Sequence, residues 1–369
     1  MNDNTKVVFQ SKPTSTNESL DTLVQLRKRA RSKYAQLPII LALTDEATKS
    51  GDYTMAKSYW NSYHCAKTLE QNGQRLKGKY CNNRWCLVCS RIRTGKLINK
   101  YKPYFKTLQE PQFVTLTAPT IIEIDLSERL YQMGKQFKQI KDNMRKMGTP
   151  LMGVRKLEVE FNPQTNKFHP HYHLVIEGKY EAECIVALWL KKNPTAKREA
   201  QNIKNADGDS LTELFKYTAK LCSKDRRTMN AYALNVIFRE LRGMRTFQSI
   251  GEFGQGEAEN DDEINPRQVA TYNELTPENE SWDWDKHDWK NSKGESLSGY
   301  EPSEAIEQFR NNLEQCNVNN VGGNLLQRMN NISTAQLSVD KARFTPVKPP
   351  FKQLYKRPPQ RATLTKILI

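Results

Sequence analysis

The 369 residues include 57 Lys and Arg against 41 Asp and Glu, a net charge of +16, and 37% of the residues are hydrophobic. The basic excess favours a polyanionic partner, with nucleic acid ranked before an anionic membrane surface. No apolar run approaches the about eighteen residues of a membrane span, and the N-terminus lacks a signal-peptide pattern, so we expect no membrane association and a cytoplasmic location. In a reducing compartment, seven cysteines indicate metal ligands before disulfides.

Composition divides the chain into five regions. In the first of them a helix is expected from Leu20 to Lys49, interrupted by Pro38. One further helix is expected near 303–315, inside the otherwise irregular C-terminal part. The regions are a polar N-terminus with a helical segment (1–52), a basic Cys-rich zinc-binding segment (53–110), an α+β domain (111–255), an acidic, mostly irregular region (256–340) and a basic tail with prolines (341–369).

The Cys-rich segment predicts a structural zinc site. A C-x2-C pair follows two earlier cysteines, a pattern typical of four thiolates that crosslink a loop-rich segment. His64 is an alternative to the first of these thiols. Basic residues interleave with the pair, as expected for phosphate contacts and base stacking. The predicted zinc ligands are Cys65, Cys81, Cys86 and Cys89, and the predicted DNA-binding residues are Arg84, Arg91, Arg93 and Lys96.

The third region alternates strand-like and helix-like patterns, which indicates an α+β domain. The period-two runs predict strands, and the 3.6-period runs predict helices. The expected elements are a strand at 113–118, a helix at 126–147, a strand at 154–161, a turn at 162–167, a strand over FHPHYHLVI (168–176) and a helix at 182–192.

Three of the five histidines of the chain lie at alternate positions of the expected strand 168–176. Because strand side chains alternate between faces, His169, His171 and His173 share one face. The short turn before them predicts antiparallel pairing with the preceding strand, which brings Glu158 close to His171 and His173. Two imidazoles and a carboxylate suit Mn²⁺ or Mg²⁺, so His171, His173 and Glu158 are the predicted ligands of a divalent metal, and His169 is a fourth candidate that either coordinates or packs.

A helix is expected over SLTELFKYTAKL (210–221), with Ser210 and Glu213 forming a capping box at its start. Glu213, Tyr217 and Lys220 would share one face at helical spacing. A tyrosine hydroxyl can attack a phosphodiester, a nearby lysine can balance charge, and a glutamate can accept a proton. On spacing alone, a packing role for Tyr217 and a surface role for Lys220 stay open.

Three motifs in this order resemble the rolling-circle replication initiators of small bacterial plasmids, a branch of the HUH endonuclease superfamily. FVTLTAP (113–119), HPHYH (169–173) and KYTAK (216–220) are similar to the family's first, second and third motifs. The Cys cluster also matches, and ELRGMRTFQSIGEF (240–253) is similar to a basic segment after the tyrosine helix. The resemblance covers about residues 60–255.

The resemblance implies a fold and a mechanism. The fold is a central antiparallel sheet of about five strands with flanking helices, preceded by the small zinc-binding segment, with the histidine strand central and the tyrosine helix facing it. Metal on His171 and His173 would polarise the scissile phosphate of plasmid origin DNA, and Tyr217 would form a 5′-phosphotyrosine link. The free 3′-OH would prime the host polymerase, with a host helicase as a further partner, and Glu213 would activate water for termination.

Arg242 and Arg245 belong to the basic segment and are further predicted DNA contacts. Two alternatives stay open at this point. An HUH transposase would perform the same chemistry on other DNA ends, whereas a relaxase places its tyrosine before the histidines. A non-catalytic zinc-dependent DNA-binding regulator would explain the charge and the cysteines, but it would leave the histidine strand unexplained.

Overall fold

The structure is a computed structural model that describes residues 16–72, 75–215, 229–253 and 278–320. Its helices are α1 (Thr16–Lys49), α2 (Tyr53–Tyr63), α3 (Leu87–Phe105), α4 (Leu126–Lys146), α5 (Lys179–Lys192), α6 (Gly208–Phe215), α7 (Ala231–Glu240) and α8 (Glu304–Asn320), with short 3-10 turns η1 (Glu123–Asp125) and η2 (Arg198–Ala200). Its strands are β1 (Thr68–Asn72), β2 (Arg75–Gly78), β3 (Gln112–Thr117), β4 (Gly153–Asn162), β5 (Lys167–Ile176), β6 (Asn202–Asn205), β7 (Phe247–Ile250), β8 (Glu278–Asp283) and β9 (Asp288–Lys290). No helix within these ranges is long and apolar enough to cross a membrane.

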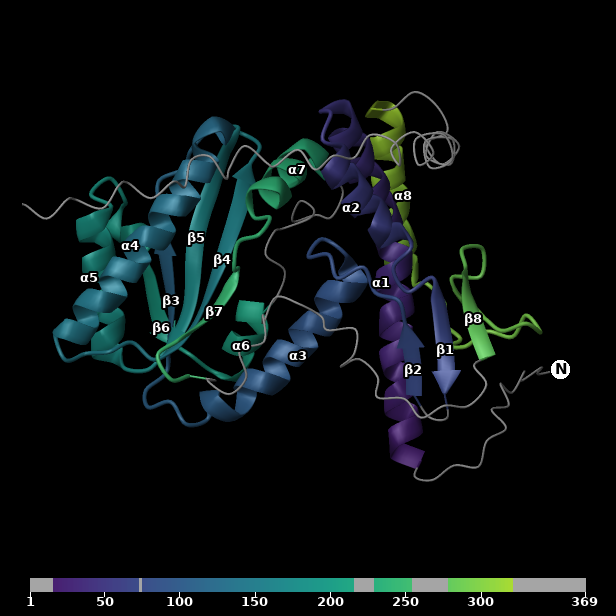
Figure 1. The fold of residues 1–369 in the computed structure, drawn as a ribbon, viewed down its shortest axis with the longest axis horizontal. Coiled ribbons are helices and arrows are strands. Elements are labelled where there is room, and N and C mark those ends of the chain that lie inside the picture. The colour runs from purple at the N-terminus through teal and green to yellow at the C-terminus, as the bar shows by residue number, and fades with distance from the viewer. Residues whose placement is uncertain (1–15, 73–74, 216–228, 254–277, 321–369) are drawn as a thin grey trace, which may run out of the picture. The chain divides into compact units, whose positions relative to one another are not determined.

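The α+β expectation is confirmed by a five-stranded antiparallel sheet with flanking helices (Figure 1). Its order is β6-β3-β5-β4-β7, so the histidine strand β5 is central. The hairpin between β4 and β5 turns at Asn162, whose Oδ1 accepts a hydrogen bond from the backbone N–H of Gln164 at 2.9 Å. Asn166 closes the turn with a φ of 50°, a left-handed conformation that asparagine tolerates. This turn fixes the register that brings Glu158 opposite His171.

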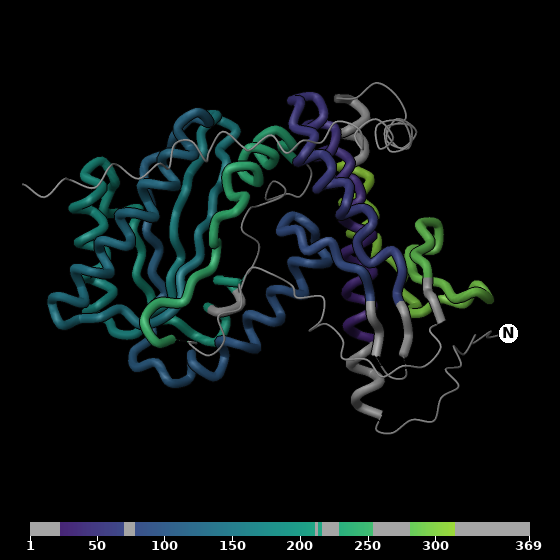
Figure 2. Tube along the Cα trace, in the orientation of Figure 1, coloured from purple at the N-terminus to yellow at the C-terminus, as the bar shows by residue number. Residues whose placement is uncertain are grey.

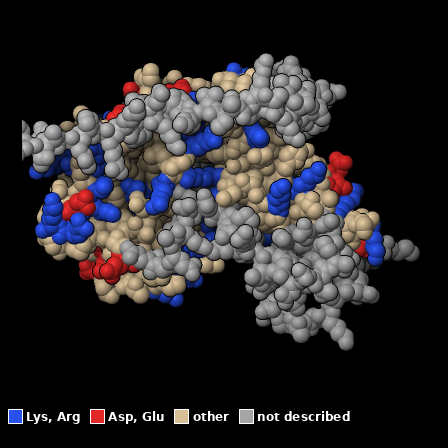
Figure 3. All heavy atoms as spheres, in the orientation of Figure 1, with Lys and Arg blue, Asp and Glu red and all other residues tan. Residues whose placement is uncertain are grey.

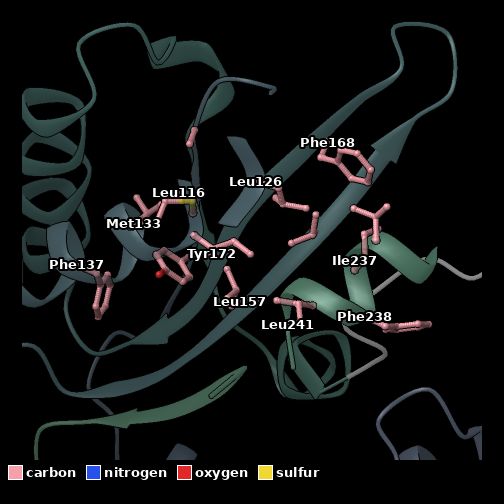
Figure 4. Close-up of a cluster of buried hydrophobic side chains, with 14 of the residues drawn as sticks. Leu116, Leu126, Met133, Phe137, Leu157, Phe168, Tyr172, Ile237, Phe238 and Leu241 are labelled. Carbon is pink, nitrogen blue, oxygen red and sulfur yellow. The ribbon is translucent and has the colours of Figure 1, made fainter. Parts of the chain in front are cut away.

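One face of the sheet is apolar and lies under α4 and α5. Residues of even number on β3 and β5 point to this face, where Tyr172 packs at 5.4 Å from the ring of Phe137 of α4 and at 5.8 Å from Trp189 of α5. Burying an aromatic side chain stabilises by about 2–3 kcal/mol, so this layer anchors the sheet. Figure 4 shows part of it: Leu116, Leu126, Met133, Phe137, Leu157, Phe168, Tyr172, Ile237, Phe238 and Leu241.

The opposite face is divided. At one end α3 and α6 cover an apolar patch in which Phe215 of α6 stacks at 5.5 Å on Tyr101 of α3 and lies 5.4 Å from Phe247 of β7. Thr94 of α3 donates a hydrogen bond to the carbonyl oxygen of Phe215 at 2.8 Å, which ties the end of α6 to α3. The other end of this face carries the histidines. This face of the sheet therefore carries a polar area beside a helix-covered apolar one.

A second, four-stranded sheet has the order β2-β1-β8-β9, and β1 pairs with β8 over a separation of more than 200 residues. Figure 2 shows by colour that the segment around β8, late in the chain, lies beside the segment around β1, early in the chain. The expectation of a mostly irregular region at 256–340 is therefore wrong for 278–320. Trp289 is fully buried there and donates a hydrogen bond to the carbonyl oxygen of Ala66 at 2.7 Å. The low average hydrophobicity of this stretch gave no signal for these strands, because a few tryptophans alone provide their core. The helix expected near 303–315 is confirmed as α8.

Pro38 does not interrupt the first helix, contrary to the expectation. The helix α1 runs through it without a break. A proline inside a helix costs about 3 kcal/mol, since it removes one hydrogen bond and crowds the preceding turn. Packing outweighs this cost, because Ala30 and Tyr34 lie in the core beside the cysteines while Ile39 and Leu43 lie in the core of the larger sheet.

Candidate functional site

The three histidines lie on one face of β5, as their spacing predicts. The strand register brings further side chains beside them: Glu158 pairs with His171, while Lys156 of β4 and Thr115 of β3 both pair with His173. Directly paired residues point to the same side of a sheet, at about 5 Å between their Cβ atoms. Five side chains from three adjacent strands therefore converge on the polar area of this face, where Lys156, Glu158 and His171 are buried.

Glu158, His171 and His173 each bring one potential ligand atom within 4.8 Å of the others. The two Nε2 atoms are 3.1 Å apart, and Oε2 of Glu158 lies 3.5 Å from Nε2 of His173 and 3.9 Å from that of His171. Ligand atoms about 2.1 Å from an ion stand about 3.0 Å apart in an octahedron and about 3.4 Å apart in a tetrahedron. The three side chains thus fit the ligand spacing of one divalent cation.

The second ring nitrogen of each of these histidines is held by a hydrogen bond. His171 Nδ1 lies 3.1 Å from the carbonyl oxygen of His169, and because a carbonyl only accepts, Nδ1 carries the proton and Nε2 keeps its lone pair. His173 Nδ1 lies 3.1 Å from Oγ1 of Thr115. Such contacts fix the ring orientation of metal-binding histidines. Among the described residues, His169 joins this arrangement through its carbonyl oxygen, and its ring is not part of the three-residue group.

Lys156 lies at the site although sequence reasoning missed it. It is 1% exposed, and its Nζ is 3.0 Å from Oε2 of Glu158. Burial alone would raise the pKa of Glu158, but the hydrogen bond with His173 and the charge of Lys156 outweigh burial and lower it to about 2. Burial and the neighbouring His173 lower the pKa of His171 to about 4. Near neutral pH both side chains are therefore in their metal-binding forms. The signal for Lys156 was its position two residues before Glu158, on the same strand face.

Helix α6 starts earlier than expected. The predicted capping box of Ser210 and Glu213 is wrong, because Asp207 caps the helix: its Oδ1 accepts from the backbone N–H of Ser210 at 2.9 Å, and Oγ of Ser210 accepts from the N–H of Asp207 at 3.0 Å. Glu213 is thus released from a capping role. Tyr217 and Lys220, predicted on the same helix, lie outside the described residues, which resume at position 229.

Glu213 is exposed, and a chain of contacts links it to the histidine site. Its Oε2 is 3.4 Å from Nζ of Lys204, which lies 4.8 Å above the ring of Phe113. Phe113 in turn lies 5.4 Å from the ring of His173. The exposed Lys204 and Glu213 form a weak ion pair, since solvent screens it. The first two turns of α6 therefore present a carboxylate on the side of the sheet that carries the metal-binding group.

The four cysteines of the predicted zinc site come together. The sulfur of Cys89 lies 3.4 Å from that of Cys65 and 3.6 Å from that of Cys81, and Cys86 completes a group whose sulfurs all lie within 4.8 Å. Four thiolates at about 2.3 Å from a zinc ion stand about 3.8 Å apart, so the group fits a tetrahedral site. His64, the alternative ligand, turns its ring edge to Trp60 and Tyr63 instead.

The thiols compete for protons in this cluster. Hydrogen bonds from Cys65, Cys86 and Cys89 hold the pKa of Cys81 far below the ordinary thiol value. Burial raises the pKa of Cys86, which lies immediately before the first residue of α3. The thiol of Cys81 thus ionises readily while that of Cys86 resists ionisation, and a bound divalent cation would remove this conflict because it stabilises thiolates.

The residues predicted to contact DNA fall into two groups. Arg84 donates to the carbonyl oxygens of Leu241 and Met244 at 3.0 and 2.5 Å, and Arg93, only 6% exposed, donates to the carbonyl and side-chain oxygens of Asn82 at 3.1 Å. These two arginines therefore form hydrogen bonds within the protein that stabilise its fold. By contrast, three of the other residues, Arg91, Arg242 and Arg245, are exposed, while Lys96 is partly exposed but has a buried Nζ. Lys and Arg are prominent on the face shown in Figure 3.

Comparisons with known proteins agree with this arrangement. A model of the Replication protein family (Rep_1) matches residues 73–295, more than half of the 369 residues. "Protein rep" of Staphylococcus aureus is 28% identical over an alignment of 179 residues, and the match covers 43% of this chain and 77% of that protein. No solved structure matches the chain. The resemblance to plasmid rolling-circle replication initiators is therefore confirmed, and the chain belongs to the Replication protein family.

Proposed function

We propose that this protein starts rolling-circle replication by nicking one strand of plasmid origin DNA with Tyr217 as the nucleophile. The observation that carries the proposal is the group of Glu158, His171 and His173 on the face of the sheet against which α6 packs. The last described residue of α6, Phe215, is anchored on this face two residues before Tyr217 in sequence. Metal ligands on one sheet face, together with the helix α6 that packs on this face and precedes Tyr217 in sequence, suit a phosphodiester transfer.

The proposed first step forms one bond and breaks another. The phenolic oxygen of Tyr217 attacks phosphorus, the bond to the 3′ oxygen breaks, and the DNA retains a free 3′-OH that takes up a proton. Mn²⁺ or Mg²⁺ bound by His171, His173 and Glu158 would supply Lewis-acid polarisation of the scissile phosphate. Lys220 would balance the charge that develops near the tyrosine. The 5′ end stays attached to the protein, and the 3′-OH would prime the host polymerase.

Termination needs a second cleavage that does not use up another tyrosine. We assign Glu213 to this step, as the base that accepts a proton from water. Two observations support the assignment: Asp207 takes the capping role that would otherwise explain Glu213, and the carboxylate is exposed and linked to His173 through Lys204 and Phe113. Zinc on the four cysteines would serve as a structural crosslink in this proposal, with no part in the chemistry.

The test uses labelled single-stranded oligonucleotides from the origin region, incubated with the full chain and Mn²⁺ and separated on a denaturing protein gel. We expect a labelled band that survives denaturation for the wild type and is lost in Tyr217→Phe and in His171→Ala. Tyr232→Phe, at another exposed tyrosine, serves as the matched control and should keep the band. Glu213→Gln should still form the adduct but release less of it. Tight DNA binding without any adduct would instead favour a zinc-dependent DNA-binding regulator.

A further inference from the structure

Three aromatic rings form a column on the rim of the cysteine cluster, far along the chain from the histidine strand. Trp60 and Tyr63 lie on α2, and their rings stack at 4.6 Å with an angle of 1° between their planes. Trp284, next to β8, continues the stack at 5.3 Å from Tyr63 and an angle of 24°. His64 sets its edge against both α2 rings. We call Trp60, Tyr63 and Trp284 the aromatic column.

The three rings of the column are ordered by stacking on one another, but they do not lie in the interior of the protein. All three rings are partly exposed. Trp60 belongs to none of the three buried clusters that the described residues form. A tryptophan that is ordered by stacking and yet excluded from the core leaves apolar area in contact with water. Partly exposed aromatic rings of this kind are typical of binding surfaces.

The two ends of the column differ in what surrounds them. At the Trp284 end, Trp282 meets the ring edge-on at 5.5 Å and Lys33 Nζ lies 5.3 Å from its centre, while Asp283 and Asp285 add negative charge alongside. The Trp60 end is less crowded. Its ring contacts, in the part of the chain that the structure describes, are with Tyr63 and His64.

Two lysines lie near this end of the column, one beside Trp60 on α2 and one next to the backbone of His64. Lys57 is exposed and precedes Trp60 by three residues on α2, so the two side chains are neighbours on the helix surface. Lys67 is also exposed, and its backbone N–H donates to the carbonyl oxygen of His64 at 3.0 Å. A flat ring face bordered by cations fits a nucleotide, whose base can stack while its phosphates meet the lysines.

We propose that the Trp60 end of the aromatic column stacks a base of unpaired DNA, so that the cysteine-bearing part of the protein holds single strand as well. The proposal depends on DNA as the partner in the proposed function, but it does not depend on the nicking chemistry. Stacking on one aromatic side chain contributes about 1–3 kcal/mol per base, so losing it should weaken binding at least about fivefold. The preference would be for unpaired DNA over duplex, whose bases are already stacked.

The test measures binding of the full chain, without added Mn²⁺, to a fluorescent oligothymidylate and to the same backbone with abasic sites. Trp60→Ala should lower affinity for the oligothymidylate about tenfold and leave affinity for the abasic strand unchanged, while Trp60→Phe should restore most of the loss. Tyr180→Ala, at a tyrosine of α5 that is 60% exposed, is the matched control and should bind as the wild type does. Bound zinc is measured in each variant, so that loss of the fold is recognised.

Two outcomes would overturn the proposal. Equal binding by the wild type and Trp60→Ala would show that the column does not stack bases and would leave it as a surface for a protein partner. An equal loss on the abasic strand would show that Trp60 acts through backbone contacts alone. Failure of the proposed function looks different, because then the wild type forms no covalent adduct whether or not Trp60 matters for binding.

Discussion

Lys156 and Glu158 offer the sharpest test of the site's electrostatics. Their side chains are 2% and 10% exposed and lie 3.0 Å apart. Removing one member of a buried pair costs about 3–5 kcal/mol, because the remaining charge loses its partner, whereas removing both together leaves neither charge of the pair unpaired. We therefore expect Lys156→Met and Glu158→Gln each to lower the free energy of unfolding by about 3 kcal/mol, and the double variant to lose much less than the sum.

The assay is urea unfolding of the three variants and the wild type, without added divalent metal, analysed as a double-mutant cycle. A coupling energy of about 2–3 kcal/mol is expected. Lys156→Arg, which keeps the charge, is the control and should show a smaller loss than Lys156→Met. If the two single effects simply add, Lys156 is not the partner of Glu158, and the reasoning about this pair is refuted.

The same variants report on metal binding. Lys156 Nζ lies at most about 5 Å from an ion bound to Glu158 Oε2, given 3.0 Å for the ion pair and about 2.1 Å for a metal bond. A unit charge and a divalent ion at that distance repel by about 6–7 kcal/mol at an effective permittivity of about 20. Relief of even a fifth of this repulsion would raise the affinity for the ion about tenfold. We expect Lys156→Met to bind Mn²⁺ at least about tenfold more tightly at pH 8, measured by calorimetry.

Three more predictions concern the rest of the site. Thr115→Val should lower Mn²⁺ affinity about 10–100-fold, because it removes the hydrogen bond that orients His173, and Thr115→Ser should restore it in the same calorimetric titration. Cys89→Ser should bind less zinc, measured by metal analysis, and should unfold at a lower temperature; unchanged zinc content would argue against the four-cysteine site. His171 has a pKa of about 4 in the folded protein and an ordinary value of 6.5, so below pH 6.5 the unfolded chain binds its proton first. The contribution of neutral His171 to the free energy of unfolding is therefore fully present above pH 6.5. About 3 kcal/mol of it is lost as the pH falls towards 4. The urea midpoint of His171→Asn should therefore not change with pH in this way. If the midpoints of the variant and the wild type change equally with pH, the lowered pKa of His171 is contradicted.

Much of the larger sheet could be predicted because its signals are local. The alternation of His169, His171 and His173 fixed a strand and a face, and the short turn after Asn162 fixed the pairing that brings Glu158 to the histidines. The metal-binding group followed from these two facts alone. Thr115 was missed because its role depends on the register of β3 against β5, which no short stretch of sequence reveals, whereas Lys156 had a local signal in its position two residues before Glu158.

The errors share a cause, which is that tertiary contacts override local patterns. Pro38 signals a helix end, yet packing on two cores carries α1 through it. Trp282 and Trp289 stand in a polar stretch that reads as irregular, and their strands form only because β1, far away in sequence, offers an edge. Arg93 was predicted to contact DNA from charge and position, but it folds inward onto Asn82. A count of charges does not distinguish an arginine that hydrogen-bonds within the protein from one that contacts DNA.

The measurement that tests the central proposal most directly is the identification of the residue attached to DNA. The full chain is incubated with Mn²⁺ and an origin oligonucleotide, digested with protease and nuclease, and the nucleotide-bearing peptide is sequenced by mass spectrometry. The account predicts a phosphodiester link on Tyr217, within the peptide that follows Phe215. A link on any other residue, or an oligonucleotide cleaved with no peptide attached, would contradict a Tyr217 nucleophile.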